Sequence, residues 1–416
     1  MAGGGLIQLV SIGAQDVYLV GNPQTTFFKV TYQRHTNFAR ECIEQTVQGT
    51  TGFGQRLTVI LSRSGDLVGS MHVEFLLPAL PSASTDNVGT LNNSKSSHTI
   101  VTKHYYQWAW VNYVGFRLLN EVTIEIGGQP IDRHYATWFY MWFELSTPAS
   151  KREGLQEMVG GWDISGNPIS YYKTATVSKR LYVPLVFWFN THPGLALPLI
   201  ALQYHEVKLY INIESLSNCI IAFKTNDDSA GLYVPVAEPE WVYPPPSTPT
   251  FTPSDFDVSD WADYYYLDSE ERRRFAQLSH EYLIKQVQQV TSTGIPVTPK
   301  ASSVIKMDYK TLNHPVVFNT WALQPDYHDI NNDWTNFTNS PPFLPYFGKN
   351  IMATHKLVLN GNDRYNVKEA GYYNLVQPYN HFTTIPPTGI LSYSYALQPV
   401  EHQPSGTLNF SRIDNA

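Results

Sequence analysis

The sequence is poor in charged residues and in cysteine. Asp, Glu, Lys and Arg make up 15% of the 416 residues, against roughly 25% in an average soluble chain. The net charge is −7, and no run of Lys and Arg is long enough to follow a phosphate backbone, so direct nucleic-acid binding is disfavoured. The two cysteines, Cys42 and Cys219, fit neither a metal-binding spacing nor a disulfide framework, which favours a reducing compartment.

Long apolar runs and catalytic motifs are also missing. The longest apolar run, Leu181–Phe189, is far shorter than the roughly 20 residues that span a bilayer. A signal peptide begins with basic residues, whereas the first basic residue of this sequence is Lys29. There is no nucleophile elbow, no phosphate-binding loop and no zinc-protease helix around His205 or His280. We therefore expect a soluble intracellular chain that is not an enzyme, with no catalytic residue, metal ligand, cofactor or transmembrane segment.

Aromatic and turn-forming residues are abundant instead. The chain has 27 Tyr, 20 Phe and 10 Trp, with 28 Pro and 26 Gly, and these types suit pleated strands joined by turns. Few charges and many amphipathic aromatics also suit a subunit that buries surface against copies of itself, because interface cores are depleted in charge and enriched in Tyr and Trp. Composition alone fits a β-rich monomer equally well.

Strand-like segments follow one another along the chain. The expected strands are Thr25–Tyr32, Arg56–Leu61, Leu67–Leu77, Glu121–Ile126, Leu181–Asn190, Leu199–Ile213, Tyr282–Val290, Ser302–Lys310, Val316–Ala322, Thr354–Leu359, Arg364–Val367, Ile390–Leu397 and Thr407–Ile413. Predicted hairpin turns lie at Ser64-Gly65, Gly127-Gly128 and Asn360-Gly361. Residues 78–103 read as a long exposed loop and residues 147–178 as a loop-rich insertion.

Helix signals are few. Asp268 followed by Glu271 has the spacing of a capping box and predicts a helix over Ser269–Ser279. The aromatic segment Ala136–Leu145 predicts either a short buried helix or a strand.

Two local patterns recur in the same order in the two parts of the chain. Thr123–Gly128 is echoed by Leu357–Gly361, and Gly194 is followed by Ala201-Leu202-Gln203 as Gly389 is by Ala396-Leu397-Gln398. We therefore predict an all-β chain of two tandem eight-stranded antiparallel jelly-roll barrels with short helices and long loops. The expected divisions are an extended N-terminal arm (1–24), a first barrel (25–238), a proline-rich linker (239–259) and a second barrel (260–416).

Polar surface motifs give weaker signals. Asn92 and Asn336 lie in glycosylation sequons within expected loops, and Asn409 lies in a third. Glu121 and Glu125 are too far apart on a strand, roughly 13 Å by strand rise, to act as a glycosidase pair.

One loop suggests an alternative function. Asp326, Asp329 and Asp333 lie in a loop rich in Trp and Asn that could bind calcium or sugar. A carbohydrate-binding jelly-roll protein is therefore the alternative from another class, and on that hypothesis replacement of Trp334 abolishes binding.

Several strings resemble the major capsid proteins of large icosahedral double-stranded DNA viruses, of the phycodnavirus and iridovirus type and closest to the algal viruses. The strings are Gly13–Leu19, Gly21–Gln24, Thr26–Lys29, Ile126–Asp132, Asn190–Leu202, Leu267-Asp268, Glu271–Phe275, His280–Ile284 and Gln403–Asp414. They are long, ordered and spread over nearly the whole chain.

The resemblance implies a structural subunit of an icosahedral capsid. It implies two jelly rolls per subunit, homotrimers of pseudo-hexagonal outline, neighbouring capsomers beside them and minor capsid proteins beneath, with an internal membrane contacted at most indirectly. The expected location is the virion, after assembly in the cytoplasm of the infected cell.

Two departures qualify the resemblance. Family members usually continue past Ser411–Asp414 with a long strand, whereas this sequence stops at Ala416; either the sequence is truncated or the second barrel lacks its last strand and closes differently. The proline-rich linker is also fuller than is expected of the family, which fits a specialised paralogue. A minor or fibre-bearing capsid protein is therefore a further alternative.

Overall fold

The computed structural model of the chain describes residues 4–80, 82–93, 96–162, 177–225, 233–235, 256–295, 303–341 and 348–416. Two compact units are distinguished, Met1–Phe38 and Ala39–Ala416. The expected proline-rich linker lies outside the described residues up to residue 255.

The N-terminal unit is helical at two places, so the prediction of an extended arm over residues 1–24 is wrong there. Helix α1 spans Gly4–Val10 and α2 spans Val17–Val20. The strand predicted at Thr25–Tyr32 is not formed, because a strand needs a partner to pair with and the first ladder begins only at Phe38. The apolar side chains of this unit are exposed within it; Phe28, for example, is 98% exposed.

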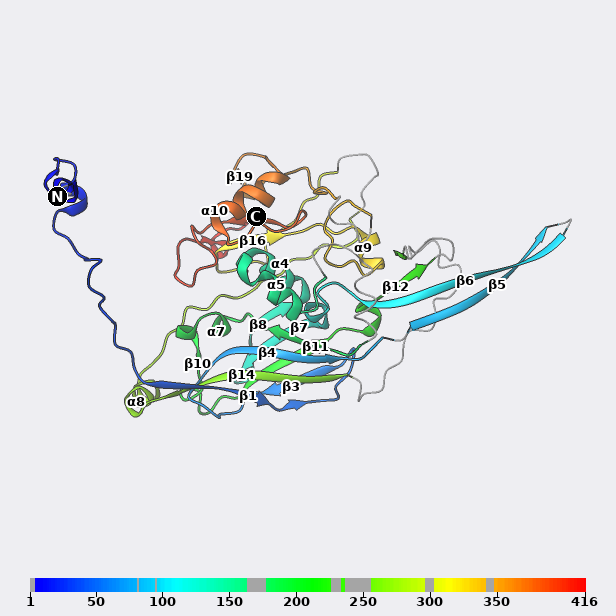
Figure 1. The fold of residues 1–416 in the computed structure, drawn as a ribbon, viewed down its shortest axis with the longest axis horizontal. Helices are drawn as coiled ribbons and strands as arrows, with labels where there is room; N and C mark the ends of the chain where they lie inside the picture. The colour runs from blue at the N-terminus through cyan, green and yellow to red at the C-terminus, as the bar shows by residue number, and fades with distance from the viewer. Residues whose placement is uncertain are drawn as a thin grey trace. The chain divides into compact units, whose positions relative to one another are not determined.

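The larger unit contains two five-stranded antiparallel sheets (Figure 1). In spatial order the first sheet contains β1 (Phe38–Gln45), β14 (Asp257–Leu267) and β4 (Leu67–Leu77), with β9 (Lys179–Pro184) and β10 (Leu197–Pro198) both paired to the other edge of β4. The second contains β2 (Val47–Gln48), β3 (Arg56–Ile60), β11 (Val207–Ile213), β7 (Leu119–Ile126) and β8 (Gln129–Tyr135). This strand order is consistent with a jelly roll.

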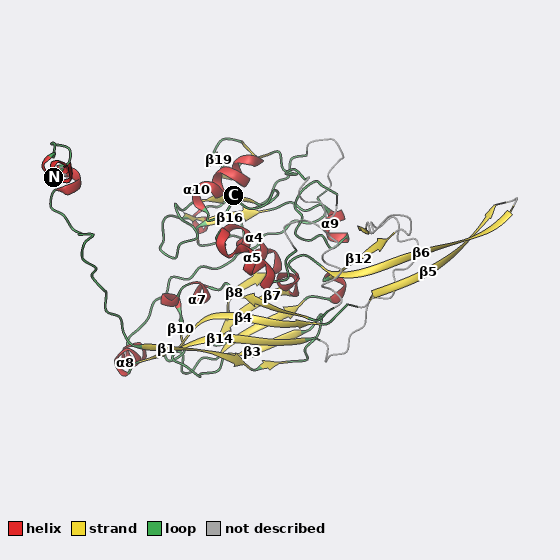
Figure 2. Cartoon of the chain, viewed as in Figure 1, coloured by secondary structure: helices red, strands yellow, loops and turns green. Residues whose placement is uncertain are grey.

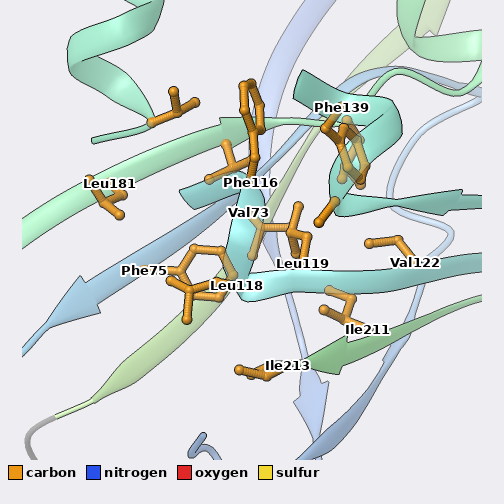
Figure 3. Packing of buried hydrophobic residues seen from close by; sticks show 14 of the residues in the cluster. Val73, Phe75, Phe116, Leu118, Leu119, Val122, Phe139, Leu181, Ile211 and Ile213 are labelled. Atoms are coloured by element: carbon orange, nitrogen blue, oxygen red, sulfur yellow. The ribbon is translucent and has the colours of Figure 1, made fainter. Parts of the chain in front are cut away.

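The inner faces of these two sheets form the main core (Figure 3). Strand β4 turns Val73 and Phe75 inward, while Val122 on β7 and Ile211 on β11 come from the other sheet, and all four are fully buried. The alternation of buried and more exposed residues along β11 is the two-residue period of a strand with one buried face.

Strand β14 corrects the predicted domain division. It pairs with β4 from Asp257↔Leu76 to Tyr265↔Leu67. Residues 257–259, assigned to the linker, and residues 260–267, assigned to the second barrel, are therefore part of the first sheet. The physical reason is that the proline density ends at Pro253, after which every backbone N–H can join a ladder.

Two other predictions about connections are wrong. Ser64-Gly65 is not a hairpin turn, since β3 and β4 belong to different sheets and the chain crosses between them there. Residues 78–103 are not simply a loop, because β5 (Ser82–Asn93) and β6 (Ser96–Trp110) pair as a long antiparallel hairpin. The polar sequence of residues 78–103 has no hydrophobic alternation that would indicate a strand. With β12 (Ile220–Thr225) and β13 (Tyr233–Pro235), β5 and β6 form a third sheet.

The second half of the chain, taken as the described residues from 268 onward, contains short ladders only. The pairs are β15 (Pro315–Val316) with β22 (Leu408–Asn409), β16 (Phe318–Trp321) with β21 (Leu391–Ser394), β17 (Thr354–His355) with β20 (Lys368–Glu369), and β18 (Val358–Leu359) with β19 (Asn362–Asp363). A small aromatic core lies here, in which burial lowers the pKa of His355 to about 4.

Several predicted strands of this half are therefore absent or shorter. Tyr282–Val290 forms no strand, and neither does the described part of Ser302–Lys310. Arg364–Val367 lies between β19 and β20 rather than in a strand. Thr407–Ile413 forms only β22 before a 3₁₀ turn, η7 (Phe410–Arg412).

Short helices connect the strands (Figure 2). They are α3 (Val114–Leu118), α4 (Ala136–Ser146), α5 (Ala149–Met158), α7 (Trp188–Thr191), α8 (Ser269–Gln277), α9 (Asp326–Ile330), α10 (Gln377–His381), the 3₁₀ turns η1 (Pro193–Leu195) and η2 (Leu216–Asn218), and a π-helix, η6 (Tyr372–Val376). The predicted cap of α8 is present, since Asp268 Oδ1 accepts from the Glu271 backbone N–H at 2.9 Å. Of the two alternatives predicted for Ala136–Leu145, a helix or a strand, the structure has the helix, α4. Leu181–Asn190 and Leu199–Ile213 are strands only in part, as β9 and β11.

In both halves, the residue three positions after the repeated glycine lies in an antiparallel strand pair. Leu197, three residues after Gly194, pairs with Val68 between β10 and β4. Ser392, three residues after Gly389, pairs with Thr320 between β21 and β16. The two predicted hairpin turns also match, because Gly127-Gly128 and Asn360-Gly361 all have positive φ, as a type I′ turn requires.

Candidate assembly site

Of the three aspartates proposed for calcium or sugar binding, Asp333 belongs to an internal polar network, whereas Asp326 and Asp329 are exposed. Asp333 is 5% exposed, and its Oδ2 accepts from Asn336 Nδ2 at 2.8 Å. Asp326 and Asp329 lie in α9. Within the part of the chain that the structure describes, no group of three or more His, Cys, Asp or Glu side chains is placed to hold a metal ion.

Trp334 also lies in the interior. It is 3% exposed, and its Nε1 donates to the carbonyl oxygen of Asn112 at 2.7 Å. A buried indole cannot stack on a sugar ring, so this residue does not support the carbohydrate-binding alternative.

The two sequons expected in exposed loops, at Asn92 and Asn336, have different surroundings. Asn336 is 1% exposed and its amide is fully engaged: Nδ2 donates to Asp333 and Ser340, and Oδ1 accepts from the backbone N–H and hydroxyl of Thr338. The expectation that Asn336 is an exposed glycosylation acceptor is therefore wrong. Asn92 lies in β5, opposite Ser97.

The two halves of the larger unit meet at a junction centred on α4. The hairpin β7–β8 turns at Gly127-Gly128 and delivers the chain to α4 at Ala136. One face of α4 packs on the main core through Phe139, which is 1% exposed and stacks on Phe116. The sequence predicts this helix only as an aromatic segment, and gives no sign that it has a second buried face.

That second face of α4 contacts strand β16. The rings of Trp138 and Trp142 stack on Phe318, with centroid distances of 6.2 and 6.0 Å. Met141 is 7% exposed, and its sulfur accepts a weak contact from the Thr320 hydroxyl at 3.9 Å. Offset aromatic pairs of this kind stabilise by about 0.5–1.5 kcal/mol beyond the area they bury.

Polar contacts continue the junction past the end of α4. The Thr384 hydroxyl donates to the carbonyl oxygen of Thr147 at 2.6 Å. The backbone N–H groups of Thr383 and Thr384 both point to the carbonyl oxygen of Leu145. These bonds satisfy carbonyl groups at the C-terminal end of a helix, which have no partner within the helix itself.

Trp334 closes the junction at another place. Besides its hydrogen bond to Asn112, its ring lies 5.7 Å from that of Tyr140 on α4, and the Arg117 guanidinium lies 5.6 Å above it. Nearby, Asn332 Nδ2 donates to the carbonyl oxygens of Ser217 and Ile220. The loop after α9 is thus fixed to the first half by aromatic and polar contacts together.

The extended segment after α8 crosses from one half to the other. The Val287 backbone N–H donates to Asp132 Oδ1 at 3.0 Å, while Lys285 Nζ donates to the carbonyl oxygen of Pro399 at 3.0 Å. The other carboxylate oxygen of Asp132 pairs with His134 Nε2 at 2.9 Å, and both side chains are buried. The two halves are therefore joined by side chains as well as by the covalent chain.

Comparisons with known proteins give the same relationship over both halves. A family model described as the major capsid protein N-terminus matches residues 26–268. A second, described as the large eukaryotic DNA virus major capsid protein, matches residues 271–416. The boundary between them falls just after β14, in agreement with the pairing of β14 in the first sheet.

Individual relatives match nearly the whole chain. The major capsid protein of Pyramimonas orientalis virus is 39% identical, covering 100% of this chain and 91% of the relative. That of Paramecium bursaria Chlorella virus 1 is 38% identical, covering 99% and 86%.

Solved structures match as well. A chain from the quasi-atomic model of the PBCV-1 virus capsid is 33% identical, with a TM-score of 0.69 and coverage of 94% of this chain and 85% of that chain. The Faustovirus major capsid protein has a TM-score of 0.65 at 16% identity, covers 97% and 89%, and supports the fold alone.

Proposed function

Because this chain belongs to the major capsid proteins of large eukaryotic DNA viruses and is a structural subunit of the viral capsid, we propose that it assembles as a homotrimer of pseudo-hexagonal outline. The observation that carries the proposal is the internal equivalence of the two halves. Each half has the same two-residue turn and the same glycine spacing, and in each half the residue three positions after that glycine lies in an antiparallel pair of strands. Three copies would present six similar units, which can tile a hexagonal lattice.

The finer architecture belongs to the same proposal. We infer that each half is a jelly-roll barrel of eight strands, with the N-terminal unit as an arm and the segment that follows β14 as the connection between the halves. The strand order of the first two sheets supports this for the first half. For the second half, the support is limited to four short antiparallel pairs, among them β16 with β21 and the hairpin β18–β19.

The partners proposed for the trimer are neighbouring capsomers beside it and minor capsid proteins beneath it, in the virion, after assembly in the host cytoplasm. Contact with an internal membrane would be indirect. Among the described helices, none is both long enough and apolar enough to cross a bilayer. Asn92 remains the sequon proposed to carry a glycan, and mass spectrometry of the peptide that contains it tests this.

The mass of the purified chain in solution tests the trimer. We expect three times the mass of one chain, 47.2 kDa, at micromolar concentration and after dilution, because obligate interfaces of about 2,000–5,000 Å² dissociate slowly. A chain that is monomeric at micromolar concentration contradicts the proposal.

A further inference from the structure

The helical stretch that begins at Ala370 and continues through η6 and α10 has an exposed apolar face. Leu375 is 51% exposed, Val376 43% and Tyr379 77%. Residues three and four apart lie on the same side of a helix, so Tyr379 lies beside the other two. The opposite side is anchored in the small aromatic core by Tyr373, which is fully buried. Apolar side chains gathered on one side of a helix indicate a surface that another molecule covers.

This helix is the counterpart of α4. Each follows a hairpin with the repeated turn: Ala136 comes eight residues after Gly128, and Ala370 nine residues after Gly361. Three residues into each helix is a buried aromatic anchor, Phe139 in one and Tyr373 in the other.

The two outward faces also correspond in position, but not in burial. Met141 and Trp142 come five and six residues after Ala136, and they pack against β16 of the second half. Leu375 and Val376 come five and six residues after Ala370 and are about half exposed. The positions that join the two halves within one chain are therefore apolar but uncovered in the second half.

We propose that the face formed by Leu375, Val376 and Tyr379 docks on the first half of a second copy of this chain, as the outward face of α4 docks on the second half of its own chain. The argument rests on the proposed trimer. In a closed ring of three chains, first and second halves alternate around the ring. Each first half then contacts the second half of its own chain on one side, and each second half contacts the first half of the next chain. At each of these contacts, either α4 or the helix at Ala370 would pack against the neighbouring half. The π-helix η6 within this stretch is a feature that occurs frequently at functional sites.

The experiment compares the oligomeric state of the full chain with that of a double variant, Leu375→Ser with Tyr379→Ser. Both side chains are more than half exposed, so the fold of the subunit should be retained, and an unchanged far-UV spectrum and melting of the subunit check this. We expect the concentration at which trimers dissociate to rise roughly 100-fold or more, since apolar anchors at an interface centre carry much of its affinity.

The matched control is the double variant Ile330→Ser with Val367→Ser, whose side chains are 54% and 57% exposed and lie outside the proposed face. It should dissociate as the unmodified chain does. If the unmodified chain is a trimer and the Leu375/Tyr379 variant dissociates at the same concentration, the docking proposal is overturned while the trimer stands; the face then serves another partner. An unmodified chain that is monomeric overturns both proposals.

Discussion

Replacing Asp260 with valine should raise the free energy of unfolding of this subunit, by about 2–4 kcal/mol near pH 7. Asp260 is fully buried on β14 and lies opposite Val73 of β4. Its neighbours two residues away on the strand, Val258 and Ala262, are buried in the core, so its carboxyl points between the two sheets. Neither oxygen has a hydrogen-bond partner among the described residues. An unsatisfied buried polar group is strongly unfavourable, and a β-branched apolar side chain fits the site.

The same residue should make stability depend on pH. Burial raises the pKa of the Asp260 carboxyl well above its ordinary value. The pKa of an Asp carboxyl in the unfolded chain is about 3.9. Because the folded-state pKa is higher, the folded protein has its full free energy of unfolding below about pH 3.9, where the carboxyl is protonated in both states. Stability is then lost as the pH rises toward the folded pKa, by up to about 1.4 kcal/mol per pH unit. The melting temperature of the unmodified chain should therefore fall between pH 5 and pH 8 relative to that of Asp260→Val.

Melting of the two proteins over this pH range is the measurement, and Asp257→Val is the matched control. Asp257 lies on the same strand but is exposed, so its replacement should leave the pH dependence as it is. Equal pH slopes for Asp260→Val and the unmodified chain would show that the carboxyl has a partner in solution. Tyr264, the titratable neighbour on the inner side of β14, donates to Gln45 and the Ser62 carbonyl, and ionises far above this range.

Much of the first half of this fold can be predicted from its sequence, because its strands have one buried face. Leu67–Leu77 matches β4 at both ends, and Glu121–Ile126 falls within β7. The turn residues Gly127-Gly128 and Asn360-Gly361 identify hairpins because few other residues adopt positive φ. The predicted hairpin at Ser64-Gly65 fails for a different reason: a turn signal does not say whether the next strand joins the same sheet.

The junction could not be predicted in the same way. Trp138 and Trp142 read as core residues of a helix or strand, and nothing in the local pattern distinguishes burial against the same half from burial against the other. The long-range pairing of β14 with β4, about 190 residues apart in sequence, is equally invisible to local periodicity. The internal repeat is the sequence feature that bears on assembly, because it makes α4 and the helix at Ala370 comparable.

The largest loss of stability should follow replacement of Trp334 with alanine. Truncating a buried Trp usually lowers the free energy of unfolding by about 3–5 kcal/mol. Here the loss includes the contact with Tyr140 on α4 and the hydrogen bond to the Asn112 carbonyl oxygen at 2.7 Å. Because these contacts join the two halves, the second half should also become more susceptible to proteolysis than in the unmodified chain. Chemical unfolding followed by fluorescence and limited proteolysis are the measurements.

Trp334→Phe is the conservative partner of this variant. It keeps a ring against Tyr140 and the Arg117 guanidinium, but it loses the Nε1–H donor and part of the buried volume of the indole. The loss of stability should therefore be smaller than for Trp334→Ala. The comparison also separates assembly from sugar recognition. If Trp334 served carbohydrate binding, its replacement would abolish glycan binding and leave the unfolding curve in place. If Trp334 fixes the junction, the opposite is expected. Trp334→Ala should unfold at the lowest denaturant concentration, Trp334→Phe at a higher one and the unmodified chain at the highest, whether or not glycan is present.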